Sequence, residues 1–153
     1  MNEQGMLRFF KRLAEGQYDV EGLHARGLKL MQFLTKLAKQ EDVDLSEMIL
    51  VGFSNGANMA VNLLLQDQSP FQKAMLFSPM YPVDVTHLQE GKQHTKVFLS
   101  LGEVDPIVPL SESKRVVEIF EERHAEVDIF WGRSHEVSLQ ALEVAKDWLK
   151  HLK

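Results

Sequence analysis

The sequence of 153 residues contains no cysteine. This absence excludes disulfide bonds, thiolate zinc sites and cysteine nucleophiles, and it is compatible with a reducing compartment. No apolar run approaches the roughly 20 residues that a membrane-spanning helix needs, and residues 1–8 have no apolar core of signal-peptide length. We therefore expect a cytoplasmic protein without a membrane span.

Concentrated charge and metal-binding motifs are missing as well. The net charge is −5, and the lysines and arginines are scattered, whereas a nucleic-acid partner requires a concentrated basic face. The histidines and carboxylates show no zinc-type spacing such as H-E-x-x-H. We expect no nucleic-acid partner, no metal and no cofactor. The 44% of apolar residues is typical of a globular protein, and the length predicts a single domain over residues 1–153.

Helical and strand-like patterns alternate along the chain. Apolar residues at three- and four-residue spacing predict helices over residues 19–40, 55–68, 111–124 and 136–152. We expect Asp19 to be the N-cap of the first helix and Ser111 the N-cap of the third. Short apolar runs predict strands over residues 48–53, 71–78, 96–101 and 125–131. The alternation predicts an α/β protein with a parallel sheet of about four strands and helices on both faces. Ligands bind such sheets beyond the carboxyl ends of the strands.

The first strand is followed by the G-x-S-x-G sequence of residues 52–56, with a predicted helix behind it. In that context the serine, Ser54, lies on a strained turn with its hydroxyl exposed, which is typical of a hydrolase nucleophile. The Asn55 N–H is then expected to donate to the developing oxyanion. A second interpretation is that Ser54 only caps the helix in a Gly-rich turn. A phosphate-binding loop is disfavoured because neither a Lys-Ser/Thr pair nor a G-x-G-x-x-G spacing is present.

A serine nucleophile needs a base and an acid, which follow it in the order Asp or Glu, then His. Asp105 comes just after the third strand, and His135 comes after the fourth. Glu103 competes for the acid role, and Asp105 alone is also explained as a turn residue before Pro106. His135 alone is also explained as a helix cap or a solvent-exposed residue. All three positions lie at carboxyl ends of separate strands in the required order, so we predict a Ser54–His135–Asp105 triad.

The segments 52–60 (GFSNGANMA) and 102–109 (GEVDPIVP), together with the His135 loop, resemble the carboxylesterase/phospholipase family, which includes acyl-protein thioesterases. Residues 2–10 also resemble the stretch before the first long helix of bacterial members. The resemblance implies an α/β-hydrolase fold, no cofactor, and hydrolysis of small carboxylic esters or thioesters. Among the residues near strand ends, we expect Phe53, Met80 and Ile107 to contact the substrate.

Two features depart from the family pattern. Members usually carry glycine before the histidine, where this chain has Ser134. Members also begin with further strands and a His-Gly loop that supplies a second oxyanion donor, and we expect a partial fold that lacks them. The edge of strand 48–53 would then be unpaired and open to association, which suggests a homo-oligomer. The alternative to an active enzyme is a catalytically impaired fragment that acts as a binding or assembly module.

Overall fold

The computed structural model describes residues 2–3, 6–7 and 19–152, and its centre is a parallel sheet of four strands. The strands follow one another in chain order across the sheet, as β3(Ile49–Phe53), β4(Lys73–Phe77), β5(Lys96–Gly102) and β6(Glu126–Gly132). Phe53 lies opposite Phe77, Phe77 opposite Ser100, and Gly102 opposite Gly132. The register therefore brings all four carboxyl ends to one rim of the sheet, and the predicted parallel sheet is confirmed.

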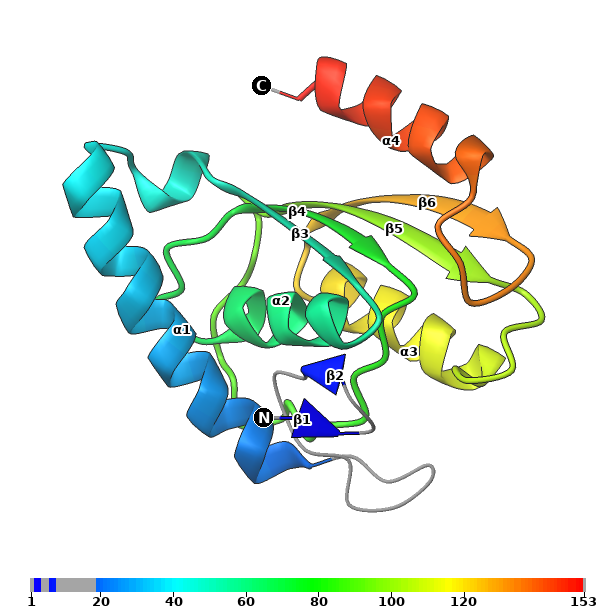
Figure 1. The fold of residues 1–153 in the computed structure, drawn as a ribbon, viewed down its shortest axis with the longest axis horizontal. Helices are drawn as coiled ribbons and strands as arrows, with labels where there is room; N and C mark the ends of the chain where they lie inside the picture. Colours follow the sequence, from blue (N-terminus) through cyan, green and yellow to red (C-terminus); the bar gives the residue numbers. More distant parts are fainter. Residues whose placement is uncertain (1, 4–5, 8–18, 153) are drawn as a thin grey trace.

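Four helices cover the two faces of this sheet (Figure 1). One face carries α1(Val20–Glu41), α2(Asn55–Leu65) and α3(Leu110–Glu122), and the opposite face carries α4(Leu139–Lys150). A short 3₁₀ turn, η1(Leu45–Glu47), precedes β3. No helix in the described part of the chain has both the length and the apolarity that crossing a bilayer requires.

Two short strands stand apart from the main sheet. β1(Asn2–Glu3) and β2(Met6–Leu7) pair with each other in antiparallel orientation, which the sequence did not predict. Much of the segment 2–10, on which the family resemblance partly rests, lies outside the described residues.

The main core lies between the sheet and the three helices on its first face. α2 is buried on nearly all sides, because it packs between the sheet and α1 (Figure 1). Its apolar side chains join Leu23 of α1 and Phe120 of α3. A smaller core on the other face joins Phe77 and Phe98 of the sheet to α4. The fold thus buries α2 in the main core, directly behind the turn that joins it to the edge strand β3.

The helix starts show which capping predictions hold. The Asp19 carboxylate accepts a hydrogen bond from the Gly22 N–H at 3.0 Å, so the predicted cap of α1 is confirmed. The predicted cap of α3 is wrong, because the N-cap is Pro109 and Ser111 already lies inside the helix. The proline ring fixes φ near the helical value, so the helix begins before Ser111. α4 begins at Leu139, three residues later than predicted.

The outer edge of β3 carries apolar side chains in contact with solvent. Val51 is 61% exposed and Phe53 is 43% exposed, and β3 pairs with β4 alone within the described sheet. An apolar edge of this kind favours association with another strand. The oligomer expected at this edge stays a prediction.

Candidate active site

The turn between β3 and α2 holds Ser54 in a strained conformation. Its φ of 56° and ψ of −114° lie in a region that residues with a side chain rarely adopt. The strain is fixed from both sides, because the Ser54 N–H donates to the Phe77 carbonyl and its carbonyl accepts from the Asn58 N–H, both at 2.9 Å. Ser54 occupies the N-cap position of α2, but its side chain makes no capping hydrogen bond, so helix capping does not explain the serine side chain.

Gly52 makes this turn sterically possible. A Cβ atom at this position would lie 2.5 Å from the backbone carbon of Gly56 and 2.6 Å from the Ala57 nitrogen. Backbone atoms cannot yield as a flexible side chain does. The first turn of α2 can therefore approach the end of β3 only because a glycine stands at position 52, as the G-x-S-x-G pattern predicts.

The three predicted triad side chains meet at the rim of the sheet. The His135 Nε2 atom lies 2.9 Å from the Ser54 Oγ atom, and its Nδ1 atom lies 2.8 Å from the Asp105 Oδ2 atom. Only 10% of the His135 side chain and 1% of the Asp105 side chain are exposed. Glu103, the competing acid, is exposed, and no hydrogen bond joins it to the His135 ring. The arrangement can pass a proton from a hydroxyl to an imidazole that a carboxylate orients.

Both oxygens of the Asp105 carboxylate are held by hydrogen bonds. Oδ2 faces the His135 ring, while Oδ1 accepts from the backbone N–H groups of Ile107 at 2.7 Å and Val108 at 2.9 Å. The turn-forming role and the acid role of Asp105 therefore coexist, since each uses a different oxygen. The turn fixes the orientation of the carboxylate toward His135.

Two loops are bound to each other beyond the ends of β5 and β6: the acid loop, which follows β5 and carries Asp105, and the histidine loop, which follows β6 and carries His135. The Glu103 N–H donates to the Gly132 carbonyl at 3.0 Å, and the Val104 N–H donates to the Arg133 carbonyl at 2.7 Å. A Cβ atom on Gly102 would lie 2.5 Å from the Ser134 carbonyl oxygen. The loop that carries His135 therefore crosses directly over Gly102.

The same loop explains why serine is tolerated at position 134. Ser134 is not among the described residues with positive φ, so its backbone does not require glycine. Its contact with Gly102 is made through the backbone carbonyl. The departure from the family pattern at this position therefore leaves the geometry of His135 intact.

Two of the three residues expected to contact substrate, Phe53 and Ile107, lie next to the triad, and the third, Met80, lies in the loop after β4. The Phe53 ring packs against the His135 ring, with 5.2 Å between the ring centroids. Ile107 is 50% exposed on the turn that holds Asp105. The Met80 N–H donates to the Asn58 Oδ1 atom at 2.6 Å, which fixes the loop after β4 to the first turn of α2. Sequence reasoning missed the contacts of Phe53 with His135 and of Asn58 with Met80, which join residues far apart in the chain.

Asn55 is the first residue of α2, and its N–H has no acceptor inside the helix. It therefore points a backbone donor away from the helix next to Ser54, as expected of one oxyanion donor. Within residues 19–152 and the two short strands, no group of three or more His, Asp and Glu side chains is arranged to hold a metal ion.

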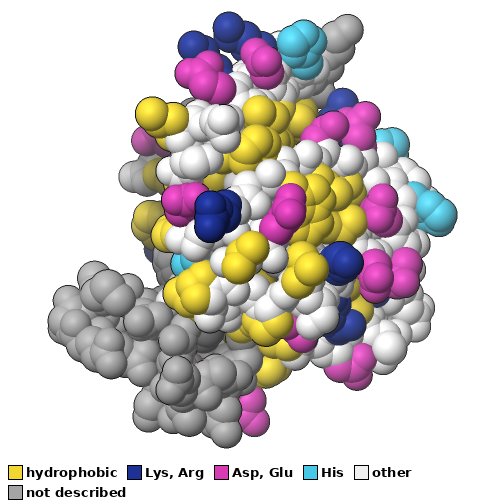
Figure 2. Space-filling model, turned by 90° about the vertical axis from the view of Figure 1, so that its right-hand side faces the viewer, with side chains coloured by type: hydrophobic (Ala, Val, Ile, Leu, Met, Phe, Trp, Pro, Cys, Tyr) yellow, Lys and Arg dark blue, Asp and Glu magenta, His cyan; other side chains and the backbone are white. Residues whose placement is uncertain are grey.

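Figure 2 looks onto the rim formed by the carboxyl ends of the strands. Hydrophobic side chains gather in the middle of this face, with acidic and basic side chains among them. A shallow hollow of about 410 Å³ lies beside the acid loop and is lined by Glu103, Val104, Leu110, Lys114 and Trp131. None of the triad side chains lines it.

Comparisons with known proteins agree on one family. The model of the family described as Phospholipase/Carboxylesterase matches residues 9–153. A Bacillus subtilis (strain 168) protein that carries the hydrolase name MhqD is 32% identical over 149 residues, which are 97% of this chain and 74% of that protein.

Solved structures agree with this family. The Bacillus cereus carboxylesterase superposes with a TM-score of 0.90 at 35% identity, over 98% of this chain and 71% of that one. The protein YahD, solved with malic acid, superposes with a TM-score of 0.91 at 30% identity, over 100% of this chain and 77% of that one. The four-stranded sheet and its helices are thus part of an α/β-hydrolase fold.

Proposed function

The chain belongs to the phospholipase/carboxylesterase family of hydrolases, and we propose that it is a serine esterase that cleaves small carboxylic esters or thioesters through an acyl-serine. The observation that carries the proposal is the continuous hydrogen-bonded chain from Ser54 through His135 to Asp105, at 2.9 Å and 2.8 Å. Nucleophile, base and orienting acid are the three parts that this chemistry needs.

In the first half of the reaction, the Ser54 Oγ atom attacks the carbonyl carbon of the ester. Its proton passes to the His135 Nε2 atom, and a C–O bond forms as the carbonyl π electrons move to the oxygen. Asp105 accepts a hydrogen bond from Nδ1, which fixes the neutral tautomer with a free Nε2 and stabilises the imidazolium that forms. The tetrahedral intermediate collapses when the imidazolium gives its proton to the leaving alcohol or thiol.

In the second half, water replaces the leaving group. His135 takes a proton from the water molecule as its oxygen attacks the acyl carbon, and the same proton then returns to the Ser54 oxygen as the acyl–oxygen bond breaks. The Asn55 N–H donates to the oxyanion in both halves, supported by the amino end of α2 behind it. A carboxylic acid leaves and the resting serine is restored.

The substrate side of the proposal rests on the apolar surroundings of the triad. Phe53 and Ile107 are partly exposed next to His135 and Asp105, and Met80 lies in the loop fixed to Asn58. These three side chains offer apolar contacts and no charge. They favour an ester or thioester with an apolar acyl or alcohol group over a highly charged one.

Turnover of p-nitrophenyl acetate and labelling by a fluorophosphonate probe test the proposal. We expect both in the wild-type chain, and we expect Ser54→Ala to lose labelling and to lower kcat by about 10³-fold or more. Ser46→Ala, a serine in η1 away from the rim, is the matched control and keeps both. Labelling that is unchanged in Ser54→Ala would refute Ser54 as nucleophile. Labelling without turnover would instead favour the alternative, a catalytically impaired fragment that acts as a binding or assembly module.

A further inference from the structure

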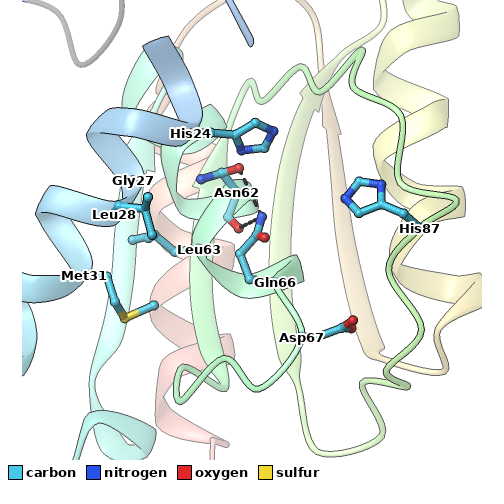
Figure 3. A pocket seen from close by; sticks show the side chains of 9 residues that line it. All are labelled: His24, Gly27, Leu28, Met31, Asn62, Leu63, Gln66, Asp67 and His87. Atoms are coloured by element: carbon cyan, nitrogen blue, oxygen red, sulfur yellow. Dashed lines mark hydrogen bonds between the residues drawn. The ribbon is translucent and has the colours of Figure 1, made fainter. Parts of the chain in front are cut away.

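A second concave site lies on the face of the sheet that α1, α2 and α3 cover, between α1, α2 and the loop after β4 (Figure 3). The cavity measures about 480 Å³, within the range of small-molecule sites. It borders the carboxyl end of α2, whereas Ser54 precedes the amino end of the same helix. The site is therefore separate from the triad.

The cavity has an apolar wall and a buried polar donor. Leu28 and Met31 of α1 and Leu63 of α2 supply the wall. Asn62 is only 2% exposed, and its Oδ1 atom accepts hydrogen bonds from the Tyr81 hydroxyl at 2.8 Å and from the Gln66 Nε2 atom at 3.3 Å. Its Nδ2 atom has no hydrogen-bond acceptor within the described chain. Although Asn62 is largely buried, this nitrogen is not among the fully buried side-chain atoms without a partner, so it is accessible from the cavity, and a ligand that accepts from it takes the place of water.

The orientation of the Asn62 amide is fixed by its neighbours. The Gln66 Nε2 atom also donates to the Asn62 backbone carbonyl at 3.0 Å, so the group that faces Asn62 Oδ1 is a donor. The Asn62 nitrogen therefore points the other way, toward α1, as Figure 3 shows. The hydrogen bonds from Gln66 and Tyr81 therefore determine which amide atom of Asn62 is the oxygen, and they leave its nitrogen as the donor without an acceptor.

Gly27 leaves the space into which this amide nitrogen points. A Cβ atom on Gly27 would lie 2.5 Å from Asn62 Nδ2. A glycine inside a helix costs about 1 kcal/mol relative to alanine, and Gly27 is buried in the middle of α1. Room for the Asn62 N–H is the structural reason for a glycine there.

Other groups at the cavity limit the charge of a ligand. The Asp67 carboxylate lines the wall, and it accepts from the backbone N–H groups of Gln89 and Glu90. The pKa of the neighbouring Glu90 carboxyl is lowered, mainly by the hydrogen bond from the Gln68 N–H and then by the one from Lys92, so a second carboxylate charge lies near Asp67. An anion is disfavoured there, and an ammonium group cannot accept from Asn62. His24 and His87 stand at the mouth without hydrogen-bond partners in the described ranges.

We propose that this cavity binds a small uncharged carboxamide with an apolar body. The amide carbonyl accepts from Asn62 Nδ2, and the amide N–H donates to the Gln66 side-chain oxygen, which accepts no hydrogen bond from the described residues. The apolar body packs against Leu28, Met31 and Leu63. The site is independent of the esterase chemistry, since none of these residues touches the triad.

Nitrogen-15 NMR of the intact chain at about pH 8, where an unperturbed histidine is neutral, tests the proposal with three six-carbon probes. Hexanamide should shift the Asn62 side-chain amide signal in a saturable way. Its affinity should exceed that of hexanoate and of hexylammonium by about fivefold or more, the value of one hydrogen bond. Equal affinity for the three probes, no saturable shift with hexanamide, or shifts confined to residues around Ser54 would each overturn the proposal.

Two variants locate the binding site. Leu28 is 68% exposed where it lines the cavity, so Leu28→Trp should fold and should weaken hexanamide binding by about tenfold, because the larger side chain obstructs the cavity. Leu139→Trp, an even more exposed leucine on α4 across the sheet, is the matched control and should bind as the wild type does. Neither change should alter turnover of p-nitrophenyl acetate. Unchanged binding in Leu28→Trp, or equal weakening in Leu139→Trp, would refute this location.

Discussion

A single added methyl group at Gly102 should disable the triad without touching any of its members. In Gly102→Ala the new Cβ would lie 2.5 Å from the Ser134 carbonyl oxygen and 2.9 Å from the Ser134 carbonyl carbon. Cβ atoms do not approach heavy atoms more closely than about 3.0 Å, and both of these atoms belong to the backbone. The loop that carries His135 must therefore move outward by at least 0.5 Å.

This displacement reaches the catalytic hydrogen bond directly, because His135 follows Ser134 in the chain. The distance from His135 Nε2 to Ser54 Oγ, now 2.9 Å, would rise to about 3.4 Å, where such a bond has lost most of its strength. Misplacement of a reacting group by about 1 Å can cost 10²-fold in rate. We therefore expect kcat for p-nitrophenyl acetate to fall by about 10-fold to 100-fold, with a much smaller change in KM.

The matched control is Gly132→Ala on the neighbouring strand. There the nearest atom to a new Cβ is Phe130 Cε2 at 3.2 Å, the end of a flexible side chain. Gly132→Ala should keep most of the wild-type kcat, and the melting temperature of both variants should be compared with the wild type to exclude unfolding. Full activity in a well-folded Gly102→Ala, or an equal loss in Gly132→Ala, would refute the reasoning.

Three further changes probe the site and the fold. Phe53→Ala should lower kcat by about threefold to fivefold, because the His135 imidazolium loses an aromatic face worth about 0.5–1 kcal/mol, while Phe53→Tyr should retain activity in the same esterase assay. Burial raises the pKa of the Tyr81 hydroxyl above its usual value of about 10. Because the pKa is higher in the folded state than in the unfolded state, the Tyr81 hydroxyl contributes its full stability below pH 10, and this contribution is lost as the pH rises further. Tyr81→Phe should lack that alkaline loss in urea unfolding between about pH 9 and pH 11, and a parallel loss in both proteins would contradict the assignment. Asp19→Ala should destabilise the protein by about 1 kcal/mol through the lost cap of α1, measured by urea unfolding.

The sequence predicts the elements of this fold well, because their signals are local. Apolar runs and helical spacing locate the four strands and four helices, and the order of serine, acid and histidine predicts which strand ends matter. The parallel register then brings Ser54, Asp105 and His135 to one rim. The error at Ser111 also has a local cause, since Pro109 starts α3 before the expected cap.

Features that depend on contacts between distant segments could not be predicted. The glycine pattern around Ser54 carries a recognisable signal, but Gly102 differs from any other glycine only because the loop from β6 crosses it. The packing of Phe53 on His135 and the bond from Asn58 to Met80 require the relative positions of three elements. The cavity beside Asn62 depends on the pairing of α1 with α2, and the two histidines at its mouth are more than sixty positions apart.

The strained backbone at Ser54 lowers the stability of the fold while it serves catalysis. A φ of 56° with a ψ of −114° costs a residue with a side chain about 1–3 kcal/mol, and glycine escapes most of that cost. Selection of random variants for heat resistance alone should therefore enrich glycine at position 54 and yield hardier but inert molecules. The persistence of serine at this position would then measure how strongly selection maintains the chemistry.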